Sequence, residues 1–370
     1  MGKILGLDDK LWPILPAILT LLGVSVEDST WQMFELSQQR QRTLDAVKHL
    51  LLRESQVQPL LLVFEDLHWI DTETQLLLDS LVESLPTTQI LFLINYRPEY
   101  EHTWSNKTYY TQLRLDPLPP ETAEELLQEL LGTDTSLESL KSLLVDRSEG
   151  NPFFLEESVR SIVETQVLVG ERGNYHLVQE LSIIQMPDTV EAMLTARIDR
   201  LPPEEKRLLQ LAAAVGSVNV EVPFSLLHAI AELPEEVLHR SLGHLQATEF
   251  LYQTNFFPEF TYTFKHALIQ EAAYQSLLKS VRQQYYQRIA QTLVEQFPDT
   301  AATHLEALAY HYTEAGLSDQ AVPYWQRAGE KAIERSAHVE AIKYFNKEIE
   351  VLKTVQAPEQ RSRYELEAQT

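Results

Sequence analysis

The residues with the clearest chemical potential are two adjacent acids, Glu65 and Asp66, at the end of the apolar run 60–64. Phosphoryl transfer from a nucleotide uses one acid to orient Mg²⁺ and its waters, and a second to activate the attacking water. In that chemistry Glu65 would be the metal-side acid, acting through water, and Asp66 the water-activating acid. The alternative is that both carboxylates are simply solvated where a strand meets a loop.

An arginine follows a second apolar run, 90–94, in the same part of the chain. Arg97 could reach a terminal phosphate with two parallel hydrogen bonds if its strand lies beside the first one. The alternative is a surface ion pair with Glu99. Ligands bind at the carboxyl edge of open parallel sheets, so the position of this arginine depends on how the two runs pair.

The segments around these residues predict a strand, helix, strand unit. Both apolar runs are short and uninterrupted, which is typical of parallel strands that are buried on both faces. Between them Asp71 is a helix N-cap, and Pro86 ends that helix. An amphipathic helix over 36–56 precedes the first strand. We therefore expect a βαβ unit at the start of the chain.

From Pro119 onward the pattern changes to helices with short connections. A small hairpin is predicted over 167–178. The run 251–264, broken at Pro258, predicts a two-stranded wing before a helix from 265 to about 278, so this region is typical of a winged-helix unit. The other helices are expected over 120–131, 136–148, 152–166, 188–200, 203–215, 223–231 and 235–247.

The last seventy residues are helical and carry a weak internal repeat. Ala321 with Tyr324 and Trp325, and Ala341 with Tyr344 and Phe345, stand twenty residues apart. Small residues at such positions let antiparallel helices approach closely, as in tetratricopeptide arrays. The aromatic residues would form either an exposed groove for a partner peptide or the core between helices. His304 and His311 are expected on one solvated helix face rather than as a metal pair.

The stretch EDLHWID at 65–71 and several later segments resemble the STAND-class ATPases. These AAA-related signalling ATPases are of the kind fused to bacterial soluble adenylyl cyclases and to large transcriptional regulators. The resemblance covers about residues 5–350 in unbroken order. Its segments are Walker B (65–71), sensor 1 (94–100), the adenine-side motif (150–157) and two winged-helix landmarks (196–202 and 264–274).

The resemblance implies roles for five residues. Glu65 and Asp66 match the Walker B acids, and Arg97 matches the sensor arginine that contacts the γ-phosphate. Pro152 matches the proline near the adenine ring, and His266 matches the winged-helix histidine that touches nucleotide diphosphate in the resting state. The implied cofactors are ATP and Mg²⁺. Two alternatives stay open, because proline at the first helical position is ordinary capping and a histidine that begins a helix is often structural.

The phosphate-binding loop of that family, Gly-x-x-x-x-Gly-Lys-Ser/Thr, is absent from all 370 residues. Gly2-Lys3-Ile4 does not replace it, because Ile4 has no hydroxyl for Mg²⁺. In the family this Walker A loop lies upstream of the matched region. The resemblance therefore implies a truncated or split member that binds nucleotide weakly and shows no independent catalysis.

The expected fold class is α/β followed by all-α. Closure on nucleotide would follow from the different subdomains that carry Arg97, Pro152 and His266. The expected domains are a partial P-loop NTPase core with Walker B and sensor 1 (1–118), a helical lid subdomain (119–186), a winged helix (187–298) and the start of a tetratricopeptide-like helical array (299–370).

Composition narrows the classes of function. The chain carries 30 Lys and Arg against 54 Asp and Glu, for a net charge of −24. Residues 187–290 hold 12 acids and 9 basic residues, a local charge of 9 − 12 = −3, so we expect no nucleic-acid partner. No cysteine is present, which excludes disulfides and thiolate metal sites and favours the cytoplasm. The longest uncharged stretch, 11–26, is too short and too broken by proline to span a membrane.

Two functions follow from these patterns. The first is the C-terminal part of an ATP-dependent signalling switch, whose cyclase, kinase or transcriptional output would lie outside this chain. The alternative is a catalytically degenerate scaffold that binds a protein partner through its C-terminal helical repeats, with self-association as a further expectation. The missing loop favours the scaffold, and the intact acids favour the switch.

Overall fold

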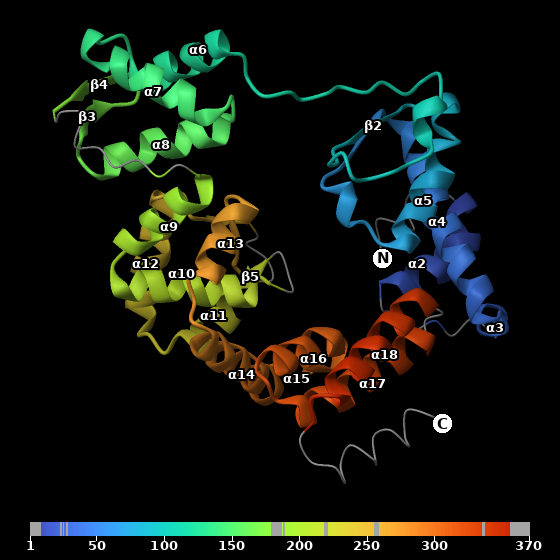
Figure 1. The fold of residues 1–370 in the computed structure, drawn as a ribbon. Helices are drawn as coiled ribbons and strands as arrows, with labels where there is room; N and C mark the ends of the chain where they lie inside the picture. Colours follow the sequence, from blue (N-terminus) through green and yellow to red (C-terminus); the bar gives the residue numbers. More distant parts are fainter. Residues whose placement is uncertain are drawn as a thin grey trace. The chain divides into compact units, whose positions relative to one another are not determined.

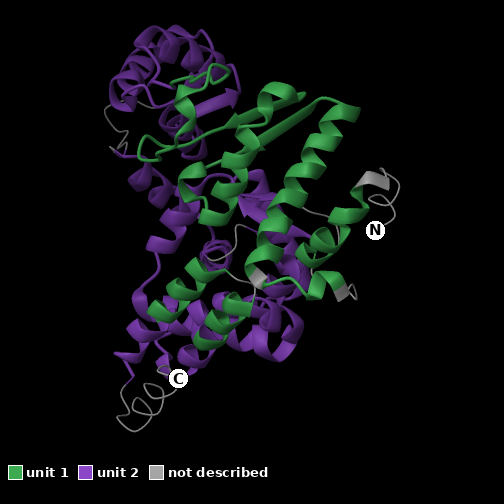
Figure 2. Cartoon of the chain, turned by 90° about the vertical axis from the view of Figure 1, so that its right-hand side faces the viewer, with its two compact units in different colours: residues 1–114, 326–347 green, residues 115–325, 348–370 purple. Residues whose placement is uncertain are grey.

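The computed structural model describes residues 9–22, 24, 26, 29–178, 187, 189–217, 221–254, 259–334 and 337–355. The chain forms two compact units, one of residues 1–114 with 326–347 and the other of 115–325 with 348–370 (Figure 2). The helices and strands are numbered in the order in which they occur along the sequence, and Figure 1 uses the same labels. Within the described residues, no helix is long and apolar enough to cross a membrane.

The first unit is built on a strand, helix, strand arrangement, as the sequence predicts. The 22-residue helix α4 leads into strand β1, and helix α5 connects β1 to strand β2. Leu60 pairs with Ile90 and Phe64 with Ile94, so the two strands are parallel and in full register. The elements of residues 9–114 are η1 (Asp9–Ile14), α2 (Leu15–Leu21), α3 (Ser29–Gln32), α4 (Leu36–Val57), β1 (Leu60–Phe64), η2 (Leu67–Trp69), α5 (Thr72–Val82), η3 (Leu85–Thr87), β2 (Ile90–Ile94) and η4 (Trp104–Asn106).

One face of the β1–β2 sheet packs on a hydrophobic cluster centred on Leu78 and Trp104, which are 0% and 3% exposed. Phe64 and Phe92 meet edge to face across the strands, with ring centroids 5.5 Å apart. Large aromatic side chains in this arrangement fix the strands on α5 as well as burying apolar area. The carboxyl ends of both strands are therefore held by one core.

The other face of the sheet is not covered by the described residues, and here the expectation of doubly buried strands is wrong. Leu61 and Val63 are 60% and 49% exposed, and Leu91 and Leu93 are 66% and 52% exposed. Side chains alternate between the two faces of a strand, and the described part of the chain packs helices and loops on one of them only. The apolar sequence of these strands is suited to burial on both faces, but the described residues cover only one face.

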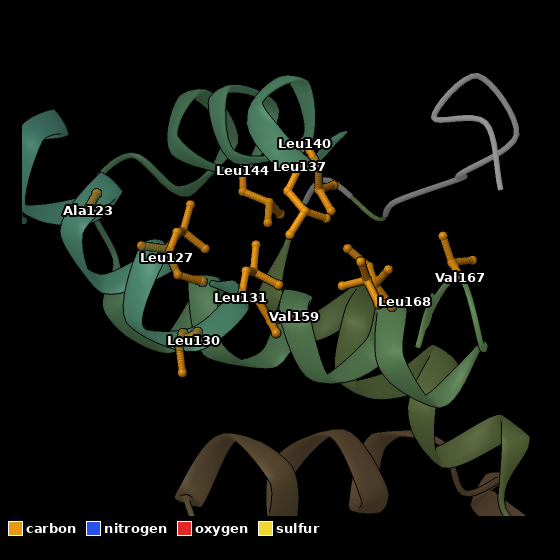
Figure 3. Close-up of a cluster of buried hydrophobic side chains, with 12 residues drawn as sticks. Ala123, Leu127, Leu130, Leu131, Leu137, Leu140, Leu144, Val159, Val167 and Leu168 are labelled. Atoms are coloured by element: carbon orange, nitrogen blue, oxygen red, sulfur yellow. The ribbon is translucent and has the colours of Figure 1, made fainter. Parts of the chain in front are cut away.

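The second unit begins with a helical module of residues 115–178, here named the α6–α8 module. Its apolar side chains gather between the helices in one cluster, in which Leu127, Leu131, Leu140 and Leu144 are fully buried (Figure 3). The hairpin predicted near residue 172 closes this module. The elements are α6 (Pro120–Leu131), η5 (Thr135–Leu137), α7 (Glu138–Ser148), α8 (Pro152–Glu164), β3 (Leu168–Glu171) and β4 (Asn174–Leu177).

The α9–α14 module, residues 189–296, follows. Its sheet has the order β5-β7-β6 with antiparallel pairs, so a short strand, β5, joins the two strands that the sequence predicts. Pro258 lies outside the described residues. The elements are α9 (Val190–Arg200), α10 (Pro203–Val215), β5 (Val222–Pro223), α11 (Phe224–Ala231), α12 (Glu235–Ala247), β6 (Leu251–Gln253), β7 (Thr261–Phe264), α13 (Ala267–Gln275) and α14 (Lys279–Gln296).

The C-terminal elements are α15 (Pro298–Thr303), α16 (Leu305–Glu314), α17 (Ser318–Glu334) and α18 (His338–Leu352). Their aromatic residues do not form an exposed groove. Tyr324 stacks on Tyr312 with ring centroids 5.5 Å apart, and Trp325 is 6% exposed and donates its indole N–H to Thr313 Oγ1 at 2.9 Å. Tyr344 and Phe345 are half-buried. Of the two sequence-based alternatives, packing between helices is therefore the correct one for these residues.

His311 is also placed differently from the expectation of a solvated helix face. It is 3% exposed on α16, with its ring centroid 5.5 Å from that of Tyr286 on α14. Its Nδ1 atom has no hydrogen-bond partner among the described residues. Burial lowers the pKa of His311 to about 4. The helical spacing places this histidine on the same face of α16 as the buried Leu308, which explains its burial.

The second unit is expected to lose stability as the pH falls from 6.5 to 4. Unfolded His311 binds a proton near pH 6.5 but the folded residue resists protonation down to about pH 4, so the unfolded state binds more protons in this window. The difference corresponds to about 3 kcal/mol at full protonation. Urea unfolding at pH 7.5, 5.5 and 4.5 measures it, with His311→Phe as the non-titrating control. An equal pH dependence in both proteins would contradict this assignment.

Candidate functional site

The carboxyl edge of the β1–β2 sheet brings together three of the sequence-predicted site residues. Glu65 and Asp66 follow β1 directly, and Arg97 follows β2 after Asn95 and Tyr96. Because the strands are parallel and in register up to their last residues, these side chains start from the same edge. All three residues are solvent-exposed. They therefore lie where a ligand can reach them.

Asn95 braces the turn that carries the two acids. Its side-chain oxygen Oδ1 accepts a hydrogen bond from the backbone N–H of Asp66 at 2.7 Å, and its carbonyl accepts one from Leu67 N at 3.0 Å. Asp66 has a φ of 55°, in the left-handed region that non-glycine residues seldom adopt. Asn95 is not among the sequence-predicted site residues, although its position directly after an apolar run is a signal in the sequence.

His68 is a second residue that the sequence analysis did not single out. Its side chain is 10% exposed, and its Nδ1 atom lies 4.0 Å from Oδ1 of Asp66. Both ring nitrogens are buried without a hydrogen-bond partner among the described residues. Its ring packs on that of Trp69 at 4.6 Å. A buried imidazole beside a carboxylate can orient that carboxylate once a hydrogen bond forms.

Arg97 lies over the indole ring of Trp69, with 5.8 Å between the guanidinium carbon and the ring centroid. Trp69 is 66% exposed. A cation–π contact at an exposed site is weak, so the guanidinium keeps its hydrogen-bond donors available for an anion. The structure thus gives Arg97 an aromatic neighbour in place of the ion pair with Glu99 considered above.

The loop after β2 is pinned beneath this edge by buried polar contacts. Trp104 donates its indole N–H to Asp79 Oδ1 at 2.8 Å, and the hydroxyls of Tyr96 and Tyr110 are 2.7 Å apart. Burial, together with this hydroxyl contact, raises the pKa of Tyr110 to about 12. The residues that flank Arg97 are therefore part of a fixed aromatic cluster rather than a free loop.

The second unit holds the two remaining candidates, Pro152 and His266. Asn151 caps α8, with its Oδ1 accepting hydrogen bonds from the backbone N–H groups of Phe153 at 3.0 Å and Phe154 at 3.3 Å. Pro152 is the exposed first residue of α8. These contacts show that Asn151-Pro152 performs the ordinary capping function, whatever else Pro152 does.

His266 and the first turn of α8 are in contact. The rings of Phe153 and His266 meet edge to face with centroids 4.3 Å apart. Partial burial lowers the pKa of His266, and the charge of Lys265 acts in the same direction. His266 precedes α13 but makes no side-chain capping bond. The structure therefore brings Pro152 and His266 to one region of the second unit.

Within the described residues, no group of three or more His, Cys, Asp or Glu side chains could enclose a metal ion. Glu65 and Asp66 offer two carboxylates. Mg²⁺ is commonly bound by one or two carboxylates while phosphate oxygens and waters complete its coordination. The donor set fits an ion whose remaining ligands come from a bound molecule and water better than a metal enclosed by the protein.

Comparison with known proteins supports the fold. No family model matches the chain. Its fold is similar to that of a STAND ATPase. The solved structure in question is a signal-transduction ATPase with numerous domains and a tetratricopeptide repeat sensor from Pyrococcus horikoshii, at a TM-score of 0.52 and 13% identity. The likeness covers 98% of this chain and 49% of that one, and at this identity it concerns the fold alone.

An uncharacterised protein of Rhizobium meliloti (strain 1021) is 28% identical over 304 residues. The match covers 78% of this chain and 27% of that relative. Both similar proteins are thus much longer than the part this chain matches.

Asp71, the last acid of the EDLHWID stretch, is expected to be structural. Its Oδ1 accepts hydrogen bonds from the backbone N–H groups of Glu73 and Thr74, both at 2.9 Å, at the start of α5. Asp71→Ala should lower the free energy of unfolding by about 1 kcal/mol, and Asp71→Asn should retain most of it. Urea unfolding checks both variants. Equal losses in Asp71→Ala and Asp71→Asn would show that the charge, not the cap, matters.

Proposed function

We propose that this chain is part of a nucleotide-dependent signalling ATPase of the STAND type, whose nucleotide site uses Glu65, Asp66 and Arg97. The observation that carries the proposal is the convergence of these three residues at the carboxyl edge of a parallel strand pair. The similarity of fold to a STAND ATPase with a repeat sensor supports the same class.

Each residue has a distinct role in this proposal. Glu65 holds Mg²⁺ through water, and Asp66 positions or activates the attacking water. Arg97 contacts the γ-phosphate, where a guanidinium can make two charge-assisted hydrogen bonds. Mg²⁺ would supply charge neutralisation of the phosphates. His68, whose Nδ1 atom lies 4.0 Å from Asp66 Oδ1, is proposed to orient that carboxylate when a hydrogen bond forms between them.

Pro152 and His266 are proposed as contacts to the adenine and to the phosphate side of a diphosphate, respectively. Their support is the local contact between the first turn of α8 and the His266 ring. The three-stranded sheet with α9–α14 is the proposed winged helix, and α15–α18 the proposed beginning of the repeat array. An output domain such as a cyclase, kinase or transcriptional regulator would lie outside this chain.

The sequence has no glycine-rich phosphate loop, and this limits what the chain does alone. Backbone N–H groups of such a loop supply most of the contacts to the β-phosphate. We therefore expect weak nucleotide binding by this chain and negligible hydrolysis. The missing loop is also the observation that favours the second candidate, a scaffold whose C-terminal helices bind a protein partner.

Arg97→Met is expected to weaken binding of Mg·ATP at least about tenfold, the effect of one charge-assisted contact, and to leave Mg·ADP binding unchanged. Trp69 is exposed beside Arg97, so a change in its fluorescence is the measure of nucleotide binding. The Trp69→Phe variant shows how much of the fluorescence change comes from Trp69. Arg172→Met, at an exposed arginine in the β3–β4 turn, is the matched control. The chain is titrated with each nucleotide to high concentration.

Two outcomes would contradict the proposal. If Arg97→Met lowers ATP and ADP binding equally, Arg97 does not distinguish the γ-phosphate. If neither nucleotide changes the fluorescence and calorimetry also detects no binding, the chain is better described as the scaffold.

A further inference from the structure

The aromatic cluster next to Arg97 has a histidine, His102, at its centre. The imidazole of His102 contacts the rings of four other side chains of the loop after β2, with centroid distances between 5.1 and 5.7 Å. Those rings belong to Tyr96, Tyr100, Trp104 and Tyr110. No step of the proposed nucleotide chemistry uses His102. A polar ring at the centre of an aromatic cluster needs hydrogen-bond partners of its own.

The backbone of the loop determines which ring nitrogen of His102 carries the proton. The Nδ1 atom accepts a hydrogen bond from the backbone N–H of Trp104 at 3.2 Å. A nitrogen that accepts a hydrogen bond has no proton, so the neutral ring carries its proton on Nε2. The Nε2 atom lies 3.1 Å from the hydroxyl oxygen of Tyr96 and 3.3 Å from that of Tyr110. His102 is therefore an acceptor toward its own loop and a donor toward the two tyrosines.

His102 Nε2 and the hydroxyl oxygens of Tyr96 and Tyr110 form a closed triangle of polar atoms, in which the two oxygens are 2.7 Å apart. Each hydroxyl can accept one hydrogen bond and donate another, so Nε2–H donates to one hydroxyl, which donates to the other. Because the protonated Nε2 accepts nothing, the hydrogen of the last hydroxyl points out of the triangle. The proton of His102 therefore orders both tyrosine hydroxyls.

Arg97 is connected to this cluster on both sides along the chain. Tyr96, which precedes Arg97, carries one corner of the triangle. The carbonyl of Arg97 accepts a hydrogen bond from the backbone N–H of Tyr100 at 3.0 Å, and the hydroxyl of Tyr100 donates one to Gln75 on α5. The backbone of Arg97 is therefore held between two anchored tyrosines, while its guanidinium lies over Trp69.

The surroundings of His102 favour its neutral form. Partial burial lowers its pKa below the usual 6.5, and the carboxylate of Asp79 on α5 opposes this to a lesser extent. The other titratable groups against its ring are the phenols of Tyr96, Tyr100 and Tyr110, and burial raises the pKa of Tyr100 and of Tyr110. A second proton on Nδ1 would face the backbone N–H that this atom now accepts. Protonation of His102 therefore breaks the arrangement.

We propose that His102 is a positioning residue for Arg97. In its Nε2–H form it holds Tyr96 and Tyr110 together, and through Tyr96 it keeps the guanidinium of Arg97 over Trp69 at the carboxyl edge of the sheet. A guanidinium that is already held in place loses less conformational freedom when it binds an anion, so positioning contributes to affinity. The contact of Arg97 with Trp69 lies within the first unit, whereas its value for the γ-phosphate rests on the proposed function.

Fluorine NMR of the full chain labelled with 5-fluorotryptophan tests the positioning without any nucleotide. The sequence has five tryptophans, and Trp69→Phe assigns the signal of Trp69. His102→Leu should shift this signal toward its position in Arg97→Met, because the guanidinium leaves the indole ring. His102→Gln keeps a side-chain N–H donor for Tyr96 and should stay close to the parent. His49→Leu, at an exposed histidine of α4 in the same unit, is the matched control.

A pH titration distinguishes positioning from a merely structural role. As the pH falls below 6.5 and His102 becomes protonated, the Trp69 signal of the parent should move in the direction seen for His102→Leu. His102→Gln lacks the imidazole and should not show this step. Nitrogen-15 spectra of labelled histidine should show the Nε2–H form of His102 at pH 7.5, and a proton on Nδ1 instead would contradict the hydrogen-bond arrangement.

Nucleotide titrations connect the positioning to the proposed site. His102→Leu should lose part of the about tenfold contribution to Mg·ATP binding that is expected of Arg97, with Mg·ADP binding unchanged, and His102→Gln should retain it. If the Trp69 signal shifts as described but no variant binds nucleotide, the positioning is supported and the proposed function fails.

A second variant covers the case in which His102→Leu does not fold. Tyr96→Phe removes a single hydroxyl and should shift the Trp69 signal in the same direction. An unchanged Trp69 signal in the folded His102→Leu or Tyr96→Phe variant would overturn the inference. An equal shift in His49→Leu, or equal shifts in His102→Leu and His102→Gln, would also overturn it.

Discussion

The pairing of β1 with β2 is the constraint on which the candidate site depends. Glu65 and Arg97 are 32 residues apart in the sequence, and only the parallel register from Leu60 with Ile90 to Phe64 with Ile94 brings them to one edge. Asn95, the first residue after β2, also holds the turn after β1, because it accepts hydrogen bonds from the backbone N–H groups of Asp66 and Leu67. A slip of one residue would turn Phe64 and Phe92 away from their core, so burial of these rings fixes the geometry of the acids as well.

In the second unit, charged side chains join helix α8 to helix α9, where Arg197 pairs with Glu157 and Glu164. The α6–α8 module is closed by its own leucine-rich cluster, and nothing in that cluster specifies where α9 should lie. Between α8 and α9, Arg197 donates hydrogen bonds to the carboxylate of Glu164, and it also donates one to the carbonyl of Thr248.

The sequence predicts the secondary structure of this chain well because its signals are local. Asp71 and Asn151 begin their helices as capping rules require, and the apolar runs 60–64 and 90–94 are strands. What it could not predict is determined by contacts distant in sequence: the third strand β5, the partner ring of Tyr286 that covers His311, and the ion pairs of Arg197.

The candidate site shows the same division. The positions of Glu65, Asp66 and Arg97 at one edge follow from strand pattern alone, whereas Asn95 and His68 acquire their importance only from the turn that places them beside Asp66.

The exposed face of the β1–β2 sheet has a practical consequence for any work with this protein. Leu61, Val63, Leu91 and Leu93 present a flat aliphatic surface to water, and such surfaces attract other apolar material. Detergent micelles, chaperones, a neighbouring molecule or a further segment of a longer polypeptide would all compete for it. The measured melting temperature of the first unit therefore depends in part on what binds this surface. Protein concentration and additives should be varied when it is measured.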